Sequence, residues 1–560
     1  MTGTQWPSIA AMLVDRAERS GSDPAVLEDG RVLSWAALHE AARSFAAVLV
    51  EDGLEVGDRV AVWAPNRSEW IVSALGLWLA GAAVVPVNTR FKGPEASVVL
   101  ERSGAKVLAV VGRFLGTDYL GMLRRADTDL PALRHTIVIG GGADMSGTGV
   151  SGTGVSGTGV SGTGVSGADI SGVAGRTEPW EAALARAGGA GRAEVDRRVA
   201  RLGRDDVSDI LFTSGTTGVP KGVVQTHGRT LNVATDWVAM AGLRGGDRYL
   251  MINPYFHMFG LKAGILASVA AGAVMIPEPV FDLDRVLETV QREKVTVLPG
   301  APTVYQSILD HPRVGQFDLS SLRVAVTGAA DIPVELIRRI RAELPFSTIV
   351  SGYGLTEAGT ATGTGPEDDF EAIATTVGRP RPGFEIRLVD PQGCDVAPGD
   401  SGEVLLRGGS VMAHYLDDPE ATAATISEDG WLRTGDLGSF DAAGRLRIVG
   451  RVKDMFIVGG FNAYPAEIEN LLLGHPDIRQ AAVIGVPDPR MGEVGMAFVV
   501  ARTGAGLSDA GVIEWARGQM ANYKVPRRVR LVDELPLNAA GKVEKETLKR
   551  QAAIEEASDV

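Results

Sequence analysis

A run of hydroxyl-bearing residues and glycines, closed by a lysine, marks the stretch of the chain best suited to bind phosphate. Residues 213–222 read Thr-Ser-Gly-Thr-Thr-Gly-Val-Pro-Lys-Gly and follow a segment, 207–212, that is apolar enough for a short buried strand. Glycines allow a tight turn in which successive N–H groups surround an anion, and the hydroxyls and the lysine add donors and positive charge. The residues expected to contact phosphate are Thr213, Ser214, Gly215, Thr216, Thr217, Gly218 and Lys221.

This loop differs from the phosphate loop of motor proteins and GTPases. Its residues do not fit the pattern G-x-x-x-x-G-K-[ST], so a protein of the Walker type is excluded. A glycine-rich surface turn without function is the alternative for any short Gly/Ser/Thr segment. The complete ten-residue run favours nucleotide binding over that alternative.

Two further glycine-containing segments follow predicted strands later in the chain. The strand predicted at 322–326 ends in Thr-Gly-Ala-Ala at 327–330, and the strand at 349–350 ends in Ser-Gly-Tyr-Gly-Leu-Thr-Glu at 351–357. In open α/β sheets, ligands bind where the carboxyl ends of the strands meet. We therefore expect three glycine-rich turns to surround one nucleotide.

The order of the predicted elements indicates an α/β fold. Strands and helices alternate in the first part of the chain, which predicts a large N-terminal domain with mainly parallel sheets. Short β-type runs and turns dominate after about residue 385, as expected of a β-rich subdomain. We place the domain boundary at 450, so that residues 1–450 form the N-terminal domain and residues 451–560 a small α+β C-terminal domain.

Composition excludes several classes of protein. The chain has 560 residues, more than one hydrophobic core organises, and its net charge of −14 argues against sequence-independent nucleic-acid binding. Cys394 is the single cysteine, which excludes an intrachain disulfide and a cysteine-based metal site. No signal peptide is predicted, and residues 71–87 are interpreted as a buried helix and strand rather than a membrane span. A cytoplasmic protein is expected.

A low-complexity insertion interrupts the N-terminal domain at 146–173. Residues 146–165 are four tandem copies of Ser-Gly-Thr-Gly-Val, a composition that cannot form a packed core. We interpret the repeat as a flexible surface segment and expect no phosphate site there.

From about residue 10 to 548, five motifs in order resemble those of the adenylate-forming superfamily, which includes acyl-CoA synthetases, adenylation domains of peptide synthetases and luciferases. The resemblance implies that the loop at 213–222 wraps the β- and γ-phosphates of ATP. It places Tyr353 against adenine, with Gly354 beside it and Gly328, Ala329 and Ala330 near the edge of the base.

The same resemblance implies the remaining roles. Thr356 contacts the α-phosphate and Glu357 holds Mg²⁺. Asp436 and Arg451 bind the ribose, and His257 borders the acyl pocket. From the C-terminal domain, Lys542 bridges the α-phosphate and the substrate carboxylate. Lys453 is the hinge about which that domain rotates, and Gly459 and Gly460 line the pantetheine tunnel.

The implied reaction joins a carboxylic acid to coenzyme A through an acyl-adenylate, with ATP and Mg²⁺. No carrier-domain motif follows the C-terminal domain, which favours coenzyme A as the acceptor. Segments 253–266, 297–306 and 365–369 resemble actinobacterial ligases that act on methylhexahydroindanedione propanoate, the steroid C/D-ring remnant.

The residues leave other functions open. A medium- or short-chain fatty acyl-CoA ligase is the first alternative, and a luciferase-like oxygenase is less favoured. A non-catalytic nucleotide-binding protein is the alternative from another class, although the retained charged residues argue against it. The expected partners are a small carboxylic acid, ATP and CoA, with neither nucleic acid nor an integral membrane segment. A homo-oligomer is left open.

Overall fold

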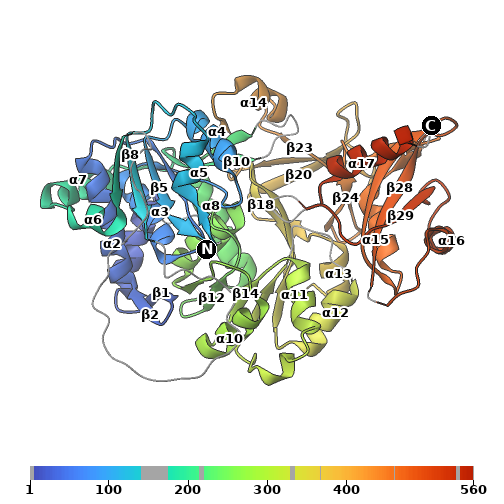
Figure 1. The fold of residues 1–560 in the computed structure, drawn as a ribbon, viewed down its shortest axis with the longest axis horizontal. Helices are drawn as coiled ribbons and strands as arrows, with labels where there is room; N and C mark the ends of the chain where they lie inside the picture. Colours follow the sequence, from blue (N-terminus) through green and yellow to red (C-terminus); the bar gives the residue numbers. More distant parts are fainter. Residues whose placement is uncertain are drawn as a thin grey trace. The chain divides into compact units, whose positions relative to one another are not determined.

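A computed structural model describes residues 6–140, 175–213, 220–327, 334–365, 368–459, 461–502, 504–537 and 543–558 (Figure 1). The chain divides into two compact units. The first consists of residues 1–299 with 410–422, and the second of residues 300–409 with 423–560.

An eight-stranded sheet forms the centre of the first unit. Its order is β22-β11-β10-β4-β3-β5-β8-β9, and neighbours are parallel except for β10–β11 and β11–β22. Its strands are β3 (Arg59–Trp63), β4 (Ala83–Pro86), β5 (Val107–Val111), β8 (His135–Ile139), β9 (Arg176–Pro179), β10 (Val207–Thr213), β11 (Lys221–Thr226) and β22 (His414–Tyr415). The mainly parallel sheet predicted from the alternation of elements is confirmed.

Helices α2 and α3 pack closely against each other because one of them carries a glycine at the contact. A Cβ on Gly76 would lie 2.7 Å from the carbonyl oxygen of Ala42. All of α3 from Trp70 to Ala80 is buried, as expected of a helix that lies inside the domain. The helices around this sheet are α1 (Ile9–Ser20), α2 (Trp35–Glu51), α3 (Ser68–Ala80), α4 (Gly93–Ser103), α5 (Tyr119–Arg125), α6 (Trp180–Ala185), α7 (Gly189–Val199) and α8 (His227–Ala241).

A second group of strands in the first unit has the order β14-β12-β13-β1-β2. All neighbours are parallel except β1 and β2. The strands are β1 (Pro24–Glu28), β2 (Arg31–Ser34), β12 (Arg248–Met251), β13 (Val274–Pro277) and β14 (Val297–Pro299), and the helical segments are η1 (Phe259–Leu266, a π-helix), α9 (Ala267–Ala271) and α10 (Leu283–Glu293). A small hairpin, β6 (Arg113–Phe114) and β7 (Thr117–Asp118), completes this unit.

The second unit begins with helices and short strands and continues into two antiparallel sheets. Its first elements are α11 (Pro302–Leu309), η2 (Val314–Gln316), β15 (Val324–Val326), α12 (Val334–Glu343) and β16 (Thr348–Val350), of which β15 and β16 pair in parallel. The first sheet is β17 (Gly352–Leu355), β18 (Gly359–Gly363) and β19 (Arg379–Pro380), with α13 (Phe370–Thr375) between the last two. The second sheet is β20 (Phe384–Val389), β21 (Gly402–Gly408), β23 (Leu432–Phe440) and β24 (Leu446–Arg451), with α14 (Pro419–Thr425).

The C-terminal part of the second unit has an apolar core of its own. Ile468, Val483 and Val499 are buried together in a cluster between helix α15 and the long hairpin β27–β28. The elements are β25 (Phe456–Val458), β26 (Phe461–Ala463), α15 (Pro465–Leu473), β27 (Ile478–Asp488), β28 (Gly492–Ala501), α16 (Asp509–Gln519), β29 (Arg528–Leu531) and α17 (Lys545–Ser558). This is the α+β composition predicted for the end of the chain.

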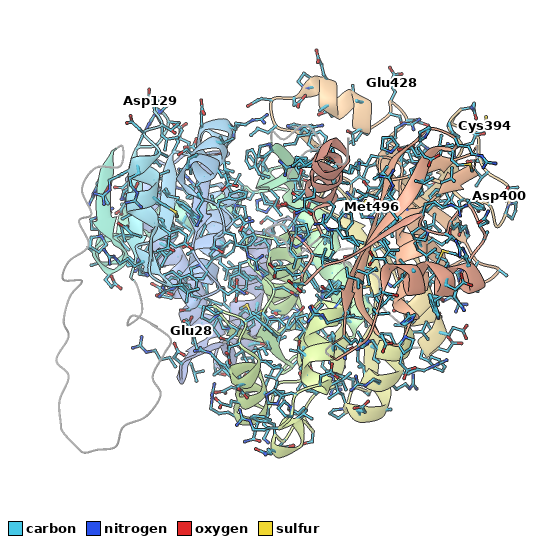
Figure 2. All side chains as sticks on the ribbon, turned by 45° about the vertical axis from the view of Figure 1, so that its right-hand side comes forward. Glu28, Asp129, Cys394, Asp400, Glu428 and Met496 are labelled. Atoms are coloured by element: carbon cyan, nitrogen blue, oxygen red, sulfur yellow. The ribbon has the colours of Figure 1, made fainter. Side chains whose placement is uncertain are left out.

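The structure decides three local points. Asn66 and Ser68 are residue types that favour helix N-termini, but neither side chain caps helix α3. The Asn66 amide donates to the carbonyl oxygens of Met251 and Asn253, and the Ser68 hydroxyl donates to Glu28. The glycine-rich turn expected at 351–357 is largely strand β17. Among the described residues, no helix is long and apolar enough to cross a membrane, and Cys394 is exposed between β20 and β21 (Figure 2).

Candidate nucleotide-binding site

Three predicted nucleotide ligands meet in the second unit. The Tyr353 hydroxyl donates to Oδ2 of Asp436 over 2.6 Å, and Nε of Arg451 lies 3.0 Å from Oδ1 of the same carboxylate. Asp436 and Arg451 are cross-strand neighbours on β23 and β24, whereas Tyr353 comes from β17. The fold thus brings together side chains that are about 80 and 100 positions apart in the sequence.

The environment keeps the Tyr353 phenol protonated. Burial, and then the negative charge of Asp436, raise the pKa of Tyr353 well above its usual value. The phenol therefore donates its hydrogen bond and leaves Asp436 as the charged acceptor. A carboxylate has about four lone-pair sites, so Asp436 can still accept hydrogen bonds from two hydroxyls of a ribose.

Glycines shape the β17–β18 hairpin that carries Tyr353. A Cβ on Gly354 would lie 2.3 Å from the carbonyl oxygen of Gly359, and one on Gly352 would lie 2.7 Å from that of Thr362. These glycines are required by the neighbouring strand, in addition to any approach of a ligand. The turn after β17 presents Thr356 and Glu357, both half-buried.

Mg²⁺ bound with a nucleotide takes most of its ligands from phosphate oxygens and water, and one or two from protein carboxylates. A single half-buried carboxylate at Glu357, on the hairpin that carries Tyr353, fits that requirement.

Two antiparallel strands of the first unit, β10 and β11, flank the loop that is predicted to bind phosphate. Thr213 at the end of β10 pairs with Lys221 at the start of β11, so the two predicted ligands face each other across the hairpin. The Lys221 ammonium lies 4.9 Å from the centre of the Tyr415 ring. Arg102, which sequence analysis did not single out, donates from Nη1 to the carbonyl oxygen of Pro220 over 2.6 Å. Arg102 lies 118 positions before Pro220 in the sequence, so no local pattern identifies it as a neighbour of the loop.

Strand β10 is also tied to the rest of its unit by a buried ion pair. Nζ of Lys262 lies 2.9 Å from Oδ1 of Asp209, and their side chains are 1% and 0% exposed. Oδ2 of Asp209 accepts hydrogen bonds from the hydroxyls of Ser208 and Thr230, at 2.6 and 2.7 Å. The pair joins β10 to η1, the π-helix that follows His257, and π-helical turns are frequent at functional sites.

His257 is exposed and lies just before η1. Its Nδ1 accepts a hydrogen bond from the backbone N–H of Phe259 over 3.2 Å. This contact fixes the imidazole ring relative to the start of the π-helix.

The remaining predicted residues fall into two sets. Lys453 is exposed, and Gly459 has φ +57° and donates its N–H to the carbonyl oxygen of Met491 over 2.8 Å. The second set lies outside the described residues and consists of Ser214, Gly215, Thr216, Thr217, Gly218, Gly328, Ala329, Ala330, Gly460 and Lys542.

One cluster elsewhere in the first unit has the residue types of a metal site, but arginines neutralise its negative charge. Asp52, His135 and Glu178 place ligand atoms within 4.8 Å of one another. The guanidinium of Arg186 donates to both carboxylates, and that of Arg176 donates to Glu178. Two arginines thus neutralise two carboxylates, and we interpret the cluster as an ion-pair network.

Known proteins share this organisation over the whole chain. Residues 13–416 match the family of AMP-binding enzymes, and residues 467–542 match the C-terminal domain of AMP-binding enzymes. The chain is similar to the crystal structure of the anthranilate CoA ligase AuaEII in complex with anthranoyl-AMP, with a TM-score of 0.82, 27% identity and coverage of 99% of both chains.

Two curated relatives are more similar in sequence. Both are named 3-[(3aS,4S,7aS)-7a-methyl-1,5-dioxo-octahydro-1H-inden-4-yl]propanoyl:CoA ligase. The protein from Rhodococcus jostii is 45% identical over 98% of this chain and 99% of its own length. The protein from Mycobacterium tuberculosis is 48% identical over 96% of this chain and 97% of its own length.

The chain belongs to the AMP-binding enzyme family. Within it, the chain is an AMP-forming acyl-CoA synthetase that uses ATP, Mg²⁺ and coenzyme A. The superfamily, the fold class and the class of reaction expected from the motifs are confirmed.

Proposed function

We propose that this enzyme converts a bicyclic dioxo-indenyl propanoate, the acid of its two relatives, into the coenzyme A thioester. The proposal is supported by the identity of 45% and 48% with those relatives over almost the whole chain. The main observation on this chain that supports a nucleotide site is that Tyr353 and Arg451 both contact one carboxylate, Asp436.

The first step forms an acyl-adenylate. A carboxylate oxygen of the acid bonds to the α-phosphorus of ATP, and the bond to the bridging oxygen breaks, so that pyrophosphate leaves with its electron pair. The nucleophile is already ionised, so catalysis consists of positioning and of neutralising charge. Bound Mg²⁺ supplies positive charge at the triphosphate, and Glu357 is the carboxylate that we assign to hold it.

This chain's residues position the nucleotide for that step. Tyr353 packs on the adenine beside Gly354, and Asp436 and Arg451 hold the ribose hydroxyls. Thr356 donates to the α-phosphate, while the loop from Thr213 to Lys221 surrounds the outer phosphates. Lys542 places its ammonium between the α-phosphate and the substrate carboxylate.

The second step transfers the acyl group. The sulfur of coenzyme A attacks the acyl carbon, and AMP leaves with the oxygen that joined it to the carbonyl. We infer that one geometry serves both steps poorly and that Lys542 withdraws before the thiol attacks. We assign the exchange to a rotation of residues 451–560 about Lys453, after which Gly459 and Gly460 line the thiol channel.

The first step can be tested by ATP–pyrophosphate exchange without coenzyme A. Exchange that depends on the bicyclic propanoate is expected. A Lys542→Ala variant should lose about 3–4 kcal/mol of transition-state stabilisation, or roughly 10²–10³-fold in rate. The matched control is Lys549→Ala, because Lys549 is a lysine on α17 that pairs with Glu546, three positions before it. Exchange that is independent of the acid, or unaffected by loss of Lys542, would contradict the proposal.

Two broader features complete the proposal. We place the enzyme in the cytoplasm, where ATP and coenzyme A are both available. All residues named above belong to one chain, so we propose that a monomer is sufficient for activity.

A further inference from the structure

The second unit contains a buried carboxylate that is not one of the predicted nucleotide ligands. Asp368 has a side chain that is 2% exposed, and it lies in the segment 365–369, one of those that resembles the steroid-degradation ligases. No step of the proposed reaction uses it. A buried carboxylate needs hydrogen bonds or charge partners, so its partners indicate what it does.

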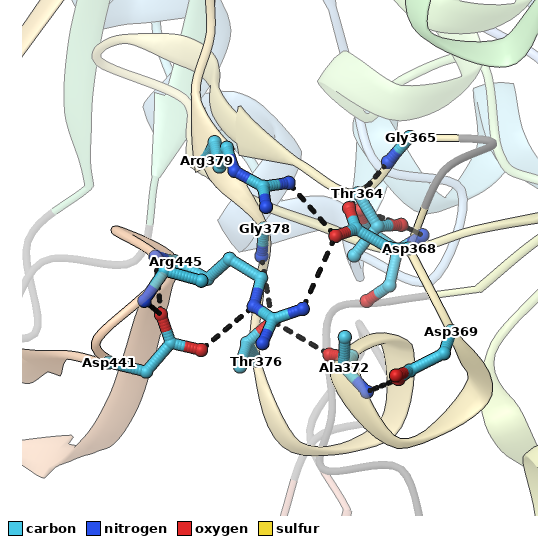
Figure 3. Close-up of polar contacts among 12 residues, drawn as sticks. Thr364, Gly365, Asp368, Asp369, Ala372, Thr376, Gly378, Arg379, Asp441 and Arg445 are labelled. Atoms are coloured by element: carbon cyan, nitrogen blue, oxygen red, sulfur yellow. Dashed lines mark hydrogen bonds and ion pairs between the residues drawn. The ribbon is translucent and has the colours of Figure 1, made fainter.

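Three donors satisfy Asp368, and they come from different parts of the second unit (Figure 3). The backbone N–H of Gly365 donates over 2.9 Å, and Nη1 of Arg379 donates over 2.9 Å. Nη1 of Arg445 donates over 3.4 Å, while its Nε donates to Asp441 over 2.8 Å. Burial raises the pKa of Asp368, but these donors outweigh it and lower the pKa below the usual value.

The two arginine donors come from the two neighbouring sheets of the second unit, β17-β18-β19 and β20-β21-β23-β24. We call the place where these sheets meet at Asp368 the junction. Arg379 lies on β19, in the same sheet as Tyr353. Arg445 lies in the turn between β23 and β24, the strands that carry Asp436 and Arg451. Asp368 is therefore the charge that links the hairpin bearing Tyr353 to the hairpin bearing its acceptor.

Backbone hydrogen bonds also connect Tyr353 to Asp436 through the same junction. Tyr353 pairs with Thr362 on β18, and Gly363 pairs with Arg379 on β19. The N–H of Val377 then donates to the carbonyl oxygen of Leu446 over 2.7 Å, and the N–H of Leu446 donates to that of Gly378 over 2.8 Å. Strands β24 and β23 lead on to Asp436, whose contact with Tyr353 completes the circuit.

The backbone of this set of paired strands is tightly packed at Gly378. Gly378 has φ +80°, and a Cβ there would lie 2.0 Å from the carbonyl carbon of Gly363. The backbone therefore packs directly on β18 at this point. A change in the Asp368–Arg445 contact would be transmitted to the separation of Tyr353 and Asp436 because few other adjustments are available.

We propose that Asp368 is a positioning residue of the nucleotide site, which acts through Arg445 to hold Tyr353 at hydrogen-bonding distance from Asp436. The inference rests on the proposed binding of adenosine by these two residues. It assigns a role to a segment that the proposed reaction leaves without one.

The test is the dissociation constant for ATP, measured by calorimetry on the full chain without acid or coenzyme A. Asp368→Asn should weaken ATP binding about tenfold or more, since the side chain keeps its shape but loses the charge that holds Arg445. Arg445→Gln should have a similar effect. Arg379→Gln should change binding by less than about threefold, because the N–H of Gly365 still holds Asp368 on the side of the Tyr353 sheet.

A double-mutant cycle separates positioning from general destabilisation. In a Tyr353→Phe background, Asp368→Asn should weaken ATP binding by less than about threefold, because the contact that it supports is already gone. Additive effects of the two substitutions, or unchanged binding in both Asp368→Asn and Arg445→Gln, would overturn the inference. If Asp368→Asn does not fold, Arg445→Gln in the two backgrounds gives the same decision.

Glu178→Gln is the matched control. Glu178 is also a buried carboxylate that accepts from two arginines, Arg176 and Arg186. It lies on β9, five strands away from β10 in its sheet, which is roughly 24 Å at the usual strand spacing. Its ATP affinity should equal that of the unmodified chain. Failure of the unmodified chain to bind ATP would instead overturn the proposed function.

Discussion

At the scale of single residues, the exposure of its ion-pair partner determines whether a predicted ligand such as Asp436 is available to a nucleotide. Asp436 is 6% exposed, yet Arg451, which neutralises it, is half exposed, so the carboxylate can exchange partners when a nucleotide arrives. The sequence motifs predicted both residues, and the structure adds the Tyr353 hydroxyl as a second partner. Arg102 was not predicted because it lies 118 positions before Pro220, whose carbonyl oxygen accepts its hydrogen bond.

Asp436→Asn should raise KM for ATP by about ten- to a hundredfold, since an amide has one accepting oxygen in place of two and carries no charge. Its cost in stability should be small, about 1 kcal/mol, because Arg451 remains hydrated. Steady-state kinetics and urea denaturation check the two effects. Glu385→Gln, which removes an exposed ion pair with Arg407 in the same unit, should leave KM unchanged. An unchanged KM in Asp436→Asn would exclude Asp436 from nucleotide binding.

A buried histidine predicts acid sensitivity. Burial lowers the pKa of His227 from 6.5 to about 4, although Asp206 and Asp209 partly oppose the shift. The ring stays neutral, and its Nδ1 accepts from the N–H of Ile9 over 3.3 Å. Because the folded pKa is the lower one, the unfolded chain takes up the proton first as the pH falls. The stabilisation is complete above pH 6.5 and is lost between there and about 4.

The expected loss is about 2 kcal/mol in the free energy of unfolding between pH 7 and pH 5, by linkage. His39 and His135 also have lowered pKa values because they are buried, so their titration adds to the same trend. The comparison of variants isolates His227. The part of this pH-dependent loss that is due to His227 should vanish in His227→Gln. It should persist in His414→Gln, which changes an exposed histidine. Equal pH dependence in both variants would contradict the assignment.

At the scale of elements, sequence predicted most strands and helices but not how they pair. The strands predicted at 207–212, 322–326 and 349–350 are present as β10, β15 and β16. Strand β17 was expected as a turn because glycines permit tight turns. Those glycines instead allow close approach of β18, and this depends on a tertiary contact that no local pattern encodes.

The ion pair between β10 and η1 gives a prediction at this scale. Lys262→Met should lower the free energy of unfolding by about 3–5 kcal/mol because it leaves Asp209 buried and charged. The double variant Asp209→Asn with Lys262→Met should be much less affected than the sum of the two single variants. Equilibrium denaturation in urea measures all three. Strict additivity would show that the two side chains do not interact.

At the scale of the whole molecule, the insertion is the largest departure from an ordinary domain. Residues 141–174 lie outside the described part, and strands β8 and β9 flank them. β8 and β9 pair in parallel from His135 opposite Arg176 to Val138 opposite Pro179. A parallel pair requires a crossover of a dozen or more residues, which explains a long connection but not its repeated sequence.

Deletion of residues 146–165 should therefore preserve fold and activity. The connection between β8 and β9 would shorten from 36 to 16 residues, which still suffices for a parallel crossover. Loop-closure entropy predicts a gain in stability of about 0.7 kcal/mol. Thermal denaturation and kcat/KM for the acid are the measurements. A large loss of either would show that the repeat has a function in the folded enzyme.

The identity of the acid is the central claim, and CoA-dependent AMP release measured over a panel of carboxylic acids tests it most directly. We predict that kcat/KM for the bicyclic dioxo-indenyl propanoate exceeds that for hexanoate and octanoate by at least about a hundredfold, or ~2.7 kcal/mol of discrimination. A higher kcat/KM for a straight-chain acid would leave the enzyme an acyl-CoA synthetase and contradict its assignment to the bicyclic substrate.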